Sequence, residues 1–408
     1  MPIRLPPYGL IVAGCLVLNL SMVTLSLFPA LIPVFRADWA LSNTEAGWIS
    51  GIYYLGLLGA VAVMTALTDR IEARAVVLAG LAISLVSALG FALSADGTWT
   101  AGFWRLCQGI GLGGTYIPGL RLLTDHLPES HRSRGTSFYT ASYYLMAGLS
   151  FFIALELEAL VGWRWAFGIS ALGPLAGLLC TILFLPPAER PQPQPGSGLF
   201  DFGSVAKNRP AVGYSLLYSL HNLEVMAFNA WLVALLVYSQ SRQDPGALGL
   251  DWNLGILAAL ITMAALPASI GVNEISQRIG RRPVIVAVML CSAAWGLLLG
   301  ALPGEAYWLV VALAFGFSAL MAADSATITS GVVLTADPRT KGRTMSFYAI
   351  VGNVGAFVGP FLFGATLDLA GGESAPSAWF AGFAAIAACT LLGPLFIVRL
   401  LGKRGSRG

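Results

Sequence analysis

The chain has 408 residues, of which 57% are hydrophobic and only 11% are charged. A soluble globular protein carries about a quarter charged residues and needs them to cover its water-facing surface. The composition therefore excludes a soluble enzyme, a disordered chain and a coiled coil. It predicts an all-α integral membrane protein, with the lipid bilayer as its surroundings and no nucleic-acid partner.

Apolar runs of membrane-spanning length follow one another along the whole sequence. A bilayer core needs about 20 consecutive apolar residues per helix. By that measure the predicted helices span residues 8–35, 43–67, 75–94, 98–123, 136–160, 165–185, 211–239, 252–276, 283–302, 305–334, 345–368 and 377–401. The first run is too long for the apolar region of a signal peptide, so we interpret it as an uncleaved first helix.

The basic residues concentrate in alternate connections, and this bias predicts the orientation of the chain. With the N-terminus in the cytoplasm, only Arg36, Arg164 and Arg242 fall in outer connections. The inner connections then hold Arg70, Arg74, Arg132, Arg134, Arg190, Lys207, Arg209, Arg278, Arg281, Arg282, Arg339, Lys341, Arg343, Lys403, Arg404 and Arg407. Both termini are predicted to be cytoplasmic, and the predicted location is the bacterial inner membrane.

The chain divides into two halves of similar pattern. Residues 186–210 are rich in proline, which predicts a semi-rigid cytoplasmic linker between a bundle at 1–185 and a second at 211–408. The motif at 70–74 recurs at 278–282, and the Ser-Phe-Tyr at 137–139 recurs at 346–348. Two matches in register indicate a duplicated six-helix unit, a transporter plan with the substrate near the midplane.

These features resemble the major facilitator superfamily over the whole length of the chain. The pair Asp69-Arg70 with Arg74 resembles the family's loop after helix two, although Thr65 and Glu72 replace its glycines. Arg105-Leu-Cys-Gln108-Gly109 resembles its R-x-x-Q-G signature in helix four, and residues 162–167 resemble its turn before helix six. The resemblance implies twelve transmembrane helices in two pseudo-symmetric six-helix bundles, alternating access, no cofactor and a monomer.

The resemblance also implies a cytoplasmic gate formed by charged loop residues. Its members are Asp69, Arg70 and Arg74, with Arg278 and Arg282 in the second copy. The alternative is that these arginines only follow the positive-inside bias. The Gly-Pro pair that drug/proton antiporters of the family carry in helix five is missing here, which disfavours multidrug antiport.

Ionisable residues inside the membrane are costly and therefore mark candidate transport sites. In helix four, Arg105, Gln108 and Tyr116 share one polar stripe, where the guanidinium either binds a substrate anion or caps carbonyl groups. In helix seven, His221 and Asn229 share a face, and Glu224 lies about 60° away from His221. Further candidates are Asp324 in helix ten, Asn19 in helix one and Asn353 in helix eleven.

These residues predict a secondary transporter for a small polar organic solute or anion, coupled to protons through Glu224, His221 or Asp324. Asp324 is also a candidate partner for Arg105. The first alternative is export of amphipathic or cationic compounds, because the acids favour a cation where Arg105 favours an anion. The second is a receptor or channel. No nucleotide-binding, hydrolase or zinc motif is present, so neither an enzyme nor a metal site is predicted.

Overall fold

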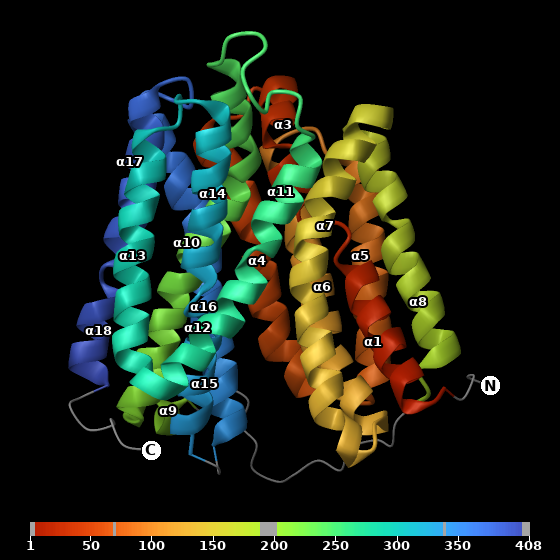
Figure 1. Cartoon of the computed structure of the whole chain (residues 1–408). Helices are drawn as coiled ribbons and strands as arrows, with labels where there is room; N and C mark the ends of the chain where they lie inside the picture. Colours follow the sequence, from red (N-terminus) through yellow and green to blue (C-terminus); the bar gives the residue numbers. More distant parts are fainter. Residues whose placement is uncertain (1–4, 68–70, 188–201, 338–339, 402–408) are drawn as a thin grey trace. The chain divides into compact units, whose positions relative to one another are not determined.

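The structure is a computed structural model that describes residues 5–67, 71–187, 202–337 and 340–401. Every regular element in those ranges is a helix. The chain forms two compact units: unit 1 comprises Met1–Leu31 and Ile52–Leu199, and unit 2 comprises Ile32–Gly51 and Phe200–Gly408. Within each unit the helices run alongside one another as long rods (Figure 1).

Unit 1 is built from the helices of the first half of the chain. It contains α1 (Pro7–Ser21), α2 (Leu27–Ala30), the part of α4 (Asn43–Leu67) from Ile52 onward, α5 (Ala73–Ser94), α6 (Thr98–His126), α7 (Glu129–Ser170) and α8 (Leu172–Phe184). The helix α5 packs along α6, and α1 packs against α6, α7 and α8. The polar stripe predicted in helix four therefore lies on a helix that is packed on several sides.

Unit 2 combines the second half of the chain with a short segment from the first. It contains α3 (Ile32–Trp39), the first turns of α4, α9 (Gly203–Lys207), α10 (Arg209–Ser241), α11 (Leu254–Met263), α12 (Ala265–Ile279), α13 (Arg281–Ala301), α14 (Tyr307–Ala322), α15 (Ser325–Thr335), α16 (Lys341–Leu369), α17 (Pro376–Thr390) and α18 (Gly393–Leu400). The helices α10 and α16 form the most extensively packed pair.

The described helices coincide with most of the twelve membrane spans expected from the sequence. Eight of the described stretches are long and apolar enough to cross a membrane. Many large apolar side chains face outward, among them Leu93, Leu160 and Val398. Such a surface is incompatible with water and suits lipid, so the chain is a multi-pass membrane protein.

The predicted first span is interrupted where the sequence suggests a continuous helix. Residues 22–26 form a turn between α1 and α2, and the main-chain N–H of Ser26 donates to Ser150 Oγ at 3.2 Å. A side chain from another helix thus replaces a helical hydrogen bond in this turn. The predicted tenth span is also broken, at Ala323 and Asp324 between α14 and α15.

The internal repeat has a structural counterpart in the two tyrosines of the Ser-Phe-Tyr motifs. In unit 1 the Tyr139 hydroxyl donates to the main-chain oxygens of Thr115 at 3.0 Å and Tyr116 at 2.9 Å, which joins α7 to α6. In unit 2 the Tyr348 hydroxyl is hydrogen-bonded to Thr329 Oγ1 at 2.8 Å, which joins α16 to α15. The repeated motif therefore connects equivalent helices in both units.

Glycines allow α4 and α6 to approach closely in unit 1. A Cβ atom added at Gly109 would overlap the main-chain oxygen of Tyr53, and one at Gly56 would overlap that of Leu106. Small residues of this kind let membrane helices pack backbone to backbone. Among the described residues, no atom lies within 4 Å of such a Cβ at Gly59, which is on the same helix as Gly56.

We expect Gly109→Ala to destabilise the protein, because overpacking a tight contact costs about 1–3 kcal/mol. A loss of that size lowers the melting temperature by several degrees. Gly59→Ala is the matched control and should leave the melting temperature unchanged or raise it slightly. Thermal unfolding of the purified protein in detergent measures both. Equal melting temperatures for the two variants would contradict the close contact.

Candidate functional site

Arg105 lies on α6 with its side chain almost entirely buried. Only 1% of the residue is exposed. Its Nη1 donates to Gln108 Oε1 at 2.8 Å and to the main-chain oxygen of Thr24 at 3.3 Å, and its Nη2 donates to that of Leu25 at 3.3 Å. The turn between α1 and α2 therefore provides the carbonyl groups that hold the guanidinium.

Aromatic rings also surround this cation. The Arg105 Cζ atom lies 4.4 Å from the ring centroid of Tyr53 and 5.9 Å from that of Phe28. A guanidinium over an aromatic face is stabilised by the ring's quadrupole, and more strongly so when water is excluded. Neither ring is predictable from the sequence, because no spacing along the chain indicates that Phe28 of α2 and Tyr53 of α4 reach α6 here.

Two hydrogen-bond donors of this cluster remain available. Among the described residues, neither Arg105 Nε nor Gln108 Nε2 has a hydrogen-bond partner, and both atoms are buried. Since Gln108 Oε1 accepts from Arg105, its amide orientation is fixed and Nε2 is the free donor. Buried unpaired donors beside a cation are an arrangement suited to an anionic group.

Tyr116, the third residue of the predicted stripe on α6, and its neighbour Thr115 have a mainly structural arrangement. The Thr115 hydroxyl donates to Ser21 Oγ at 3.2 Å, and the half-buried Tyr116 ring stacks with Tyr139. Asn19 of α1 is half-buried, and within the described chain its Oδ1 has no hydrogen-bond partner. Asn19 is therefore another candidate site residue of unit 1, with an acceptor oxygen that no described residue uses.

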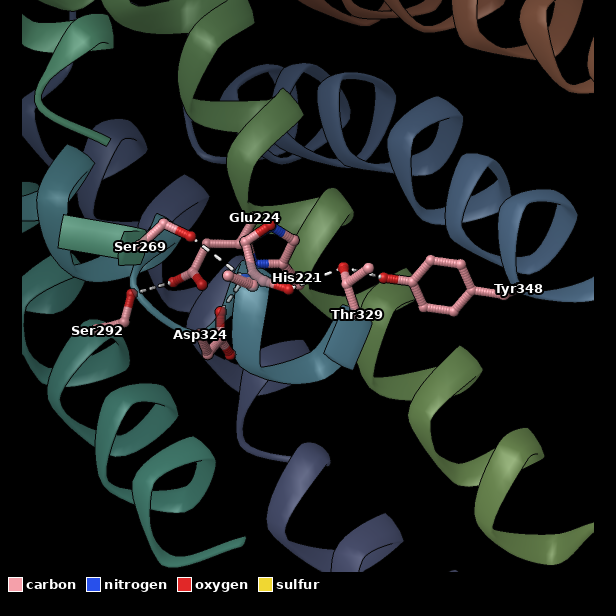
Figure 2. A network of polar contacts seen from close by, with 9 residues as sticks. His221, Glu224, Ser269, Ser292, Asp324, Thr329 and Tyr348 are labelled. Atoms are coloured by element: carbon pink, nitrogen blue, oxygen red, sulfur yellow. Dashed lines mark hydrogen bonds and ion pairs between the residues drawn. The ribbon is translucent and has the colours of Figure 1, made fainter. Parts of the chain in front are cut away.

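In unit 2 the structure brings His221 of α10 and Asp324 together, 103 residues apart in sequence. His221 Nδ1 and Asp324 Oδ1 are hydrogen-bonded at 2.9 Å, and both side chains are buried (Figure 2). Asp324 lies at the break between α14 and α15, where its own side chain does not cap α15.

Glu224 lies one turn further along α10 in the same cluster. It is 3% exposed and accepts a hydrogen bond from Ser292 Oγ of α13 at 2.7 Å (Figure 2). A single hydroxyl is a weak partner for a carboxylate removed from water, which costs free energy unless the charge is paired. The cluster thus contains two acids and one imidazole that lie close together in the membrane.

A stack of aromatic rings continues from this cluster toward α16. The ring of Tyr218 stacks on His221 with centroids 5.9 Å apart and on Tyr348 with centroids 4.1 Å apart. The Tyr348 hydroxyl is in turn hydrogen-bonded to Thr329 Oγ1, so the stack ends on a side chain of α15 (Figure 2). The sequence gives no indication that Tyr348 or Ser292 reaches this cluster.

The remaining amides of unit 2 differ in how they are used. Asn353 Nδ2 donates to Ala349 O of its own helix at 2.8 Å, which is a local bond. Asn229 is half-buried, and within the described ranges its Oδ1 has no partner. Asn229 therefore keeps an acceptor for a ligand, whereas Asn353 uses one of its amide hydrogens within its own helix.

The structure shows the surroundings of three of the predicted gate residues, Arg74, Arg278 and Arg282. Asp69 and Arg70 lie outside the described residues. Arg74 Nη2 donates to Ile182 O at the end of α8, and Arg282 Nη2 donates to Leu401 O after α18. Each arginine thus binds carbonyl groups at the C-terminal end of the last helix of its own unit, where a positive charge is favourable. Arg278 is exposed in the last turn of α12.

The His221–Asp324 contact predicts strong energetic coupling between the two side chains. Removing one partner of a buried pair costs about 3–5 kcal/mol, since the other partner is left unpaired. We expect His221→Phe and Asp324→Leu each to lower the melting temperature, and the double variant to lose less than the sum. A double-mutant cycle on thermal unfolding measures the coupling, and additive effects would contradict the contact.

Comparisons with known proteins agree with this architecture. The sequence profile of the Major Facilitator Superfamily matches residues 12–252 and 215–407. The chain is 32% identical to the "Niacin transporter NiaP" of Acinetobacter baylyi over 140 residues, 33% of this chain and 30% of that protein. It is 27% identical to the "Probable 4-methylmuconolactone transporter" of Cupriavidus pinatubonensis over 299 residues, 68% of this chain and 64% of that protein. The matches thus span under two thirds of these relatives' lengths.

Solved structures show the same fold. The nucleoside transporter NupG has a TM-score of 0.75 at 14% identity, covering 95% of this chain and 99% of that one. A bacterial homologue of the human lysosomal transporter Spinster has a TM-score of 0.69 at 14% identity, covering 96% of this chain and 95% of that one. With the sequence profile matching almost the whole length, the chain belongs to the major facilitator superfamily.

Proposed function

We propose that this protein is a proton-coupled secondary transporter that carries small organic carboxylates across the membrane by alternating access. The observation that carries the proposal is the pair of buried, unpaired donors at Arg105 and Gln108. A carboxylate that accepts from a guanidinium N–H and an amide N–H gains charge-assisted hydrogen bonds. The nearby rings of Tyr53 and Phe28 offer apolar contact to the body of an organic acid.

The relatives support a carboxylate more than a cation. Besides the carriers of niacin and 4-methylmuconolactone, the "Benzoate transport protein" of Acinetobacter baylyi is 22% identical over 45% of this chain and 40% of that protein. Niacin and benzoate are both planar aromatic carboxylates. Their shared chemistry matches a cation flanked by aromatic rings, so an aromatic monocarboxylate is the first substrate to test.

The cluster in unit 2 supports proton coupling. Ionisable groups buried in membrane proteins commonly serve in proton relays. Glu224, His221 and Asp324 are three such groups, and within the described chain none of them forms an ion pair with a lysine or arginine. We assign the exchanged proton to this cluster and the substrate carboxylate to Arg105, which separates the two tasks between the units.

The proposal includes the arrangement of the protein in its membrane. It has six-helix domains at 1–185 and 211–408 joined by a cytoplasmic linker at 186–210, and it works as a monomer. The basic connections support an inner membrane with both termini in the cytoplasm. Asp69, Arg70, Arg74, Arg278 and Arg282 are proposed to act at the cytoplasmic gate.

Gln108→Glu is the sharpest test of the anion site. The new carboxylate still accepts from Arg105 Nη1, but it replaces the free amide donor with a negative charge. We expect at least tenfold weaker binding of benzoate and nicotinate, because one charge-assisted hydrogen bond is worth about 1.5–3 kcal/mol. Thermal-shift titration with these carboxylates measures the loss.

Arg242→Gln, which changes an exposed arginine of unit 2, is the control and should bind like the parent. Unchanged carboxylate binding by a folded Gln108→Glu variant would reject the site. A panel of amphipathic cations belongs in the same titration. Stabilisation by cations and not by carboxylates would favour the export alternative instead.

Glu224→Gln tests the coupling. The amide keeps the size and the hydrogen bond with Ser292, but it does not exchange a proton. We expect exchange of labelled substrate to continue in proteoliposomes, whereas accumulation driven by a pH gradient falls to the level without a gradient. Glu305→Gln, which neutralises an exposed acid, should keep full accumulation. Gradient-driven accumulation by Glu224→Gln would remove this carboxyl from the coupling mechanism.

A further inference from the structure

The turn between α1 and α2 is fastened to α7 by a closed set of hydrogen bonds. The main-chain N–H of Ser26 donates to Ser150 Oγ at 3.2 Å, and Ser150 Oγ donates in turn to the main-chain oxygen of Ala147 at 3.0 Å. The Ser26 hydroxyl donates to the same oxygen at 3.2 Å. Ser26 is 5% exposed and Ser150 is fully buried, so these bonds lie away from water. The N–H that the turn removes from the helix therefore still has a partner.

This N–H of Ser26 is the one that a continuous helix would direct at the main-chain oxygen of Met22. In the turn, the Met22 oxygen accepts instead from the N–H of Leu25 at 2.9 Å, one residue earlier. Without the Ser150 hydroxyl, the Ser26 N–H would be unpaired in the interior unless it returned to the Met22 oxygen, and an unpaired buried donor is costly. Ser150 thus favours the turn over a regular helical bond at this position.

Pro29 favours the same turn from within α2. In a regular helix the main-chain oxygen of Leu25 accepts from the N–H four residues later, but residue 29 is a proline and has no N–H. Its ring would also clash with that oxygen if the helix were continuous. Because α2 begins at Leu27, Pro29 falls in its first turn, where no intrahelical donor is needed. The Leu25 oxygen is thereby left for a donor from another helix.

That donor is the guanidinium of Arg105. Its Nη2 donates to the Leu25 oxygen and its Nη1 to the Thr24 oxygen, each at 3.3 Å. Together with Gln108 Oε1, these two carbonyl groups fix the plane of the guanidinium. The plane determines where Nε points, the atom that has no hydrogen-bond partner in the described chain. The direction of this available donor therefore depends on the conformation of the turn.

We propose that Ser150 and Pro29 are positioning residues of the proposed carboxylate site. Neither touches the substrate, and both act through the turn, which directs the Arg105 guanidinium at its ligand. A guanidinium that is already held in place loses less freedom on binding, so the two residues raise the affinity for a carboxylate. The identity of the ligand rests on the proposed function, whereas the dependence of Arg105 on the turn does not.

Ser150→Ala is the first test, with benzoate and nicotinate as the probes. We expect roughly fivefold weaker binding in thermal-shift titration, the size expected when one hydrogen bond is lost. Because the guanidinium itself remains, the substrate concentration for half-maximal uptake into proteoliposomes should rise, while the maximal rate stays within about twofold of the parent rate. Ser150→Thr keeps a hydroxyl that can bond to the same oxygen one turn earlier in the helix, and it should restore binding.

Pro29→Ala tests the inference from the other side of the turn. The new N–H can donate to the Leu25 oxygen and so competes with Arg105 for it. We expect weaker binding of the same two carboxylates, again with a larger effect on half-maximal concentration than on maximal rate. This variant leaves the bonds of Ser150 in place, so it reports on the turn and not on a local defect in α7.

Ser87→Ala is the matched control. Ser87 is a fully buried serine of α5 whose hydroxyl donates to the main-chain oxygen of Ser84 at 3.0 Å, so its replacement removes a buried local bond of the same kind. It should bind carboxylates like the parent. Melting temperature and size-exclusion profile verify that each variant is folded. Parent affinity in folded Ser150→Ala and Pro29→Ala variants overturns the positioning role, as does an equal loss of affinity in the control.

A double-mutant cycle separates this inference from the proposed function. Ser150→Ala and Arg105→Met are combined, and thermal unfolding is measured without ligand. Residues that act on a shared partner have non-additive effects, so the loss in the double variant should be smaller than the sum of the single losses by about 2 °C or more. Additive losses overturn the positioning role. If the parent binds no carboxylate, the proposed function fails, whereas a non-additive cycle still supports the action of Ser150 on Arg105.

Discussion

Burial of charge away from water is the constraint around which both units are arranged. A guanidinium or carboxylate inside a bilayer is costly unless it is hydrogen-bonded, paired or exposed to water. Arg105 meets this requirement with two main-chain carbonyls, an amide oxygen and an aromatic face. His221 and Asp324 meet it by bonding to each other. Within the described chain Arg105 Nε has no hydrogen-bond partner, so this donor can bind a ligand.

The breaks in the helices belong to the same arrangement. A continuous helix uses its own carbonyl groups, whereas the turn at 22–26 offers those of Thr24 and Leu25 to Arg105. At the break between α14 and α15, Asp324 turns to His221 and does not cap the following helix. In transporters, discontinuous helices typically mark the binding sites. Here each unit has one break beside its buried ionisable cluster.

Hydrophobic pattern predicted the membrane helices well, and the second predicted span, 43–67, coincides with α4. It did not predict the break in the first span, because apolar periodicity carries no information about a guanidinium from another helix. Residue type and helical face identified Arg105, His221, Glu224 and Asp324 as candidates. The sequence did not identify their partners, since Ser292 lies 68 residues from Glu224 and Asp324 lies 103 residues from His221.

The internal repeat extends to residues that join helices, but it does not extend to the buried ionisable residues. The two units can therefore have different functions on the same scaffold. Equivalent residues do equivalent structural work: Tyr139 and Tyr348 join neighbouring helices, and Arg74 and Arg282 bind carbonyls at terminal helix ends. The ionisable clusters have no such correspondence, since unit 1 buries a cation and unit 2 buries two acids and an imidazole. A duplicated frame therefore holds two unlike clusters, and the proposed carrier would use one for an anion and the other for a proton.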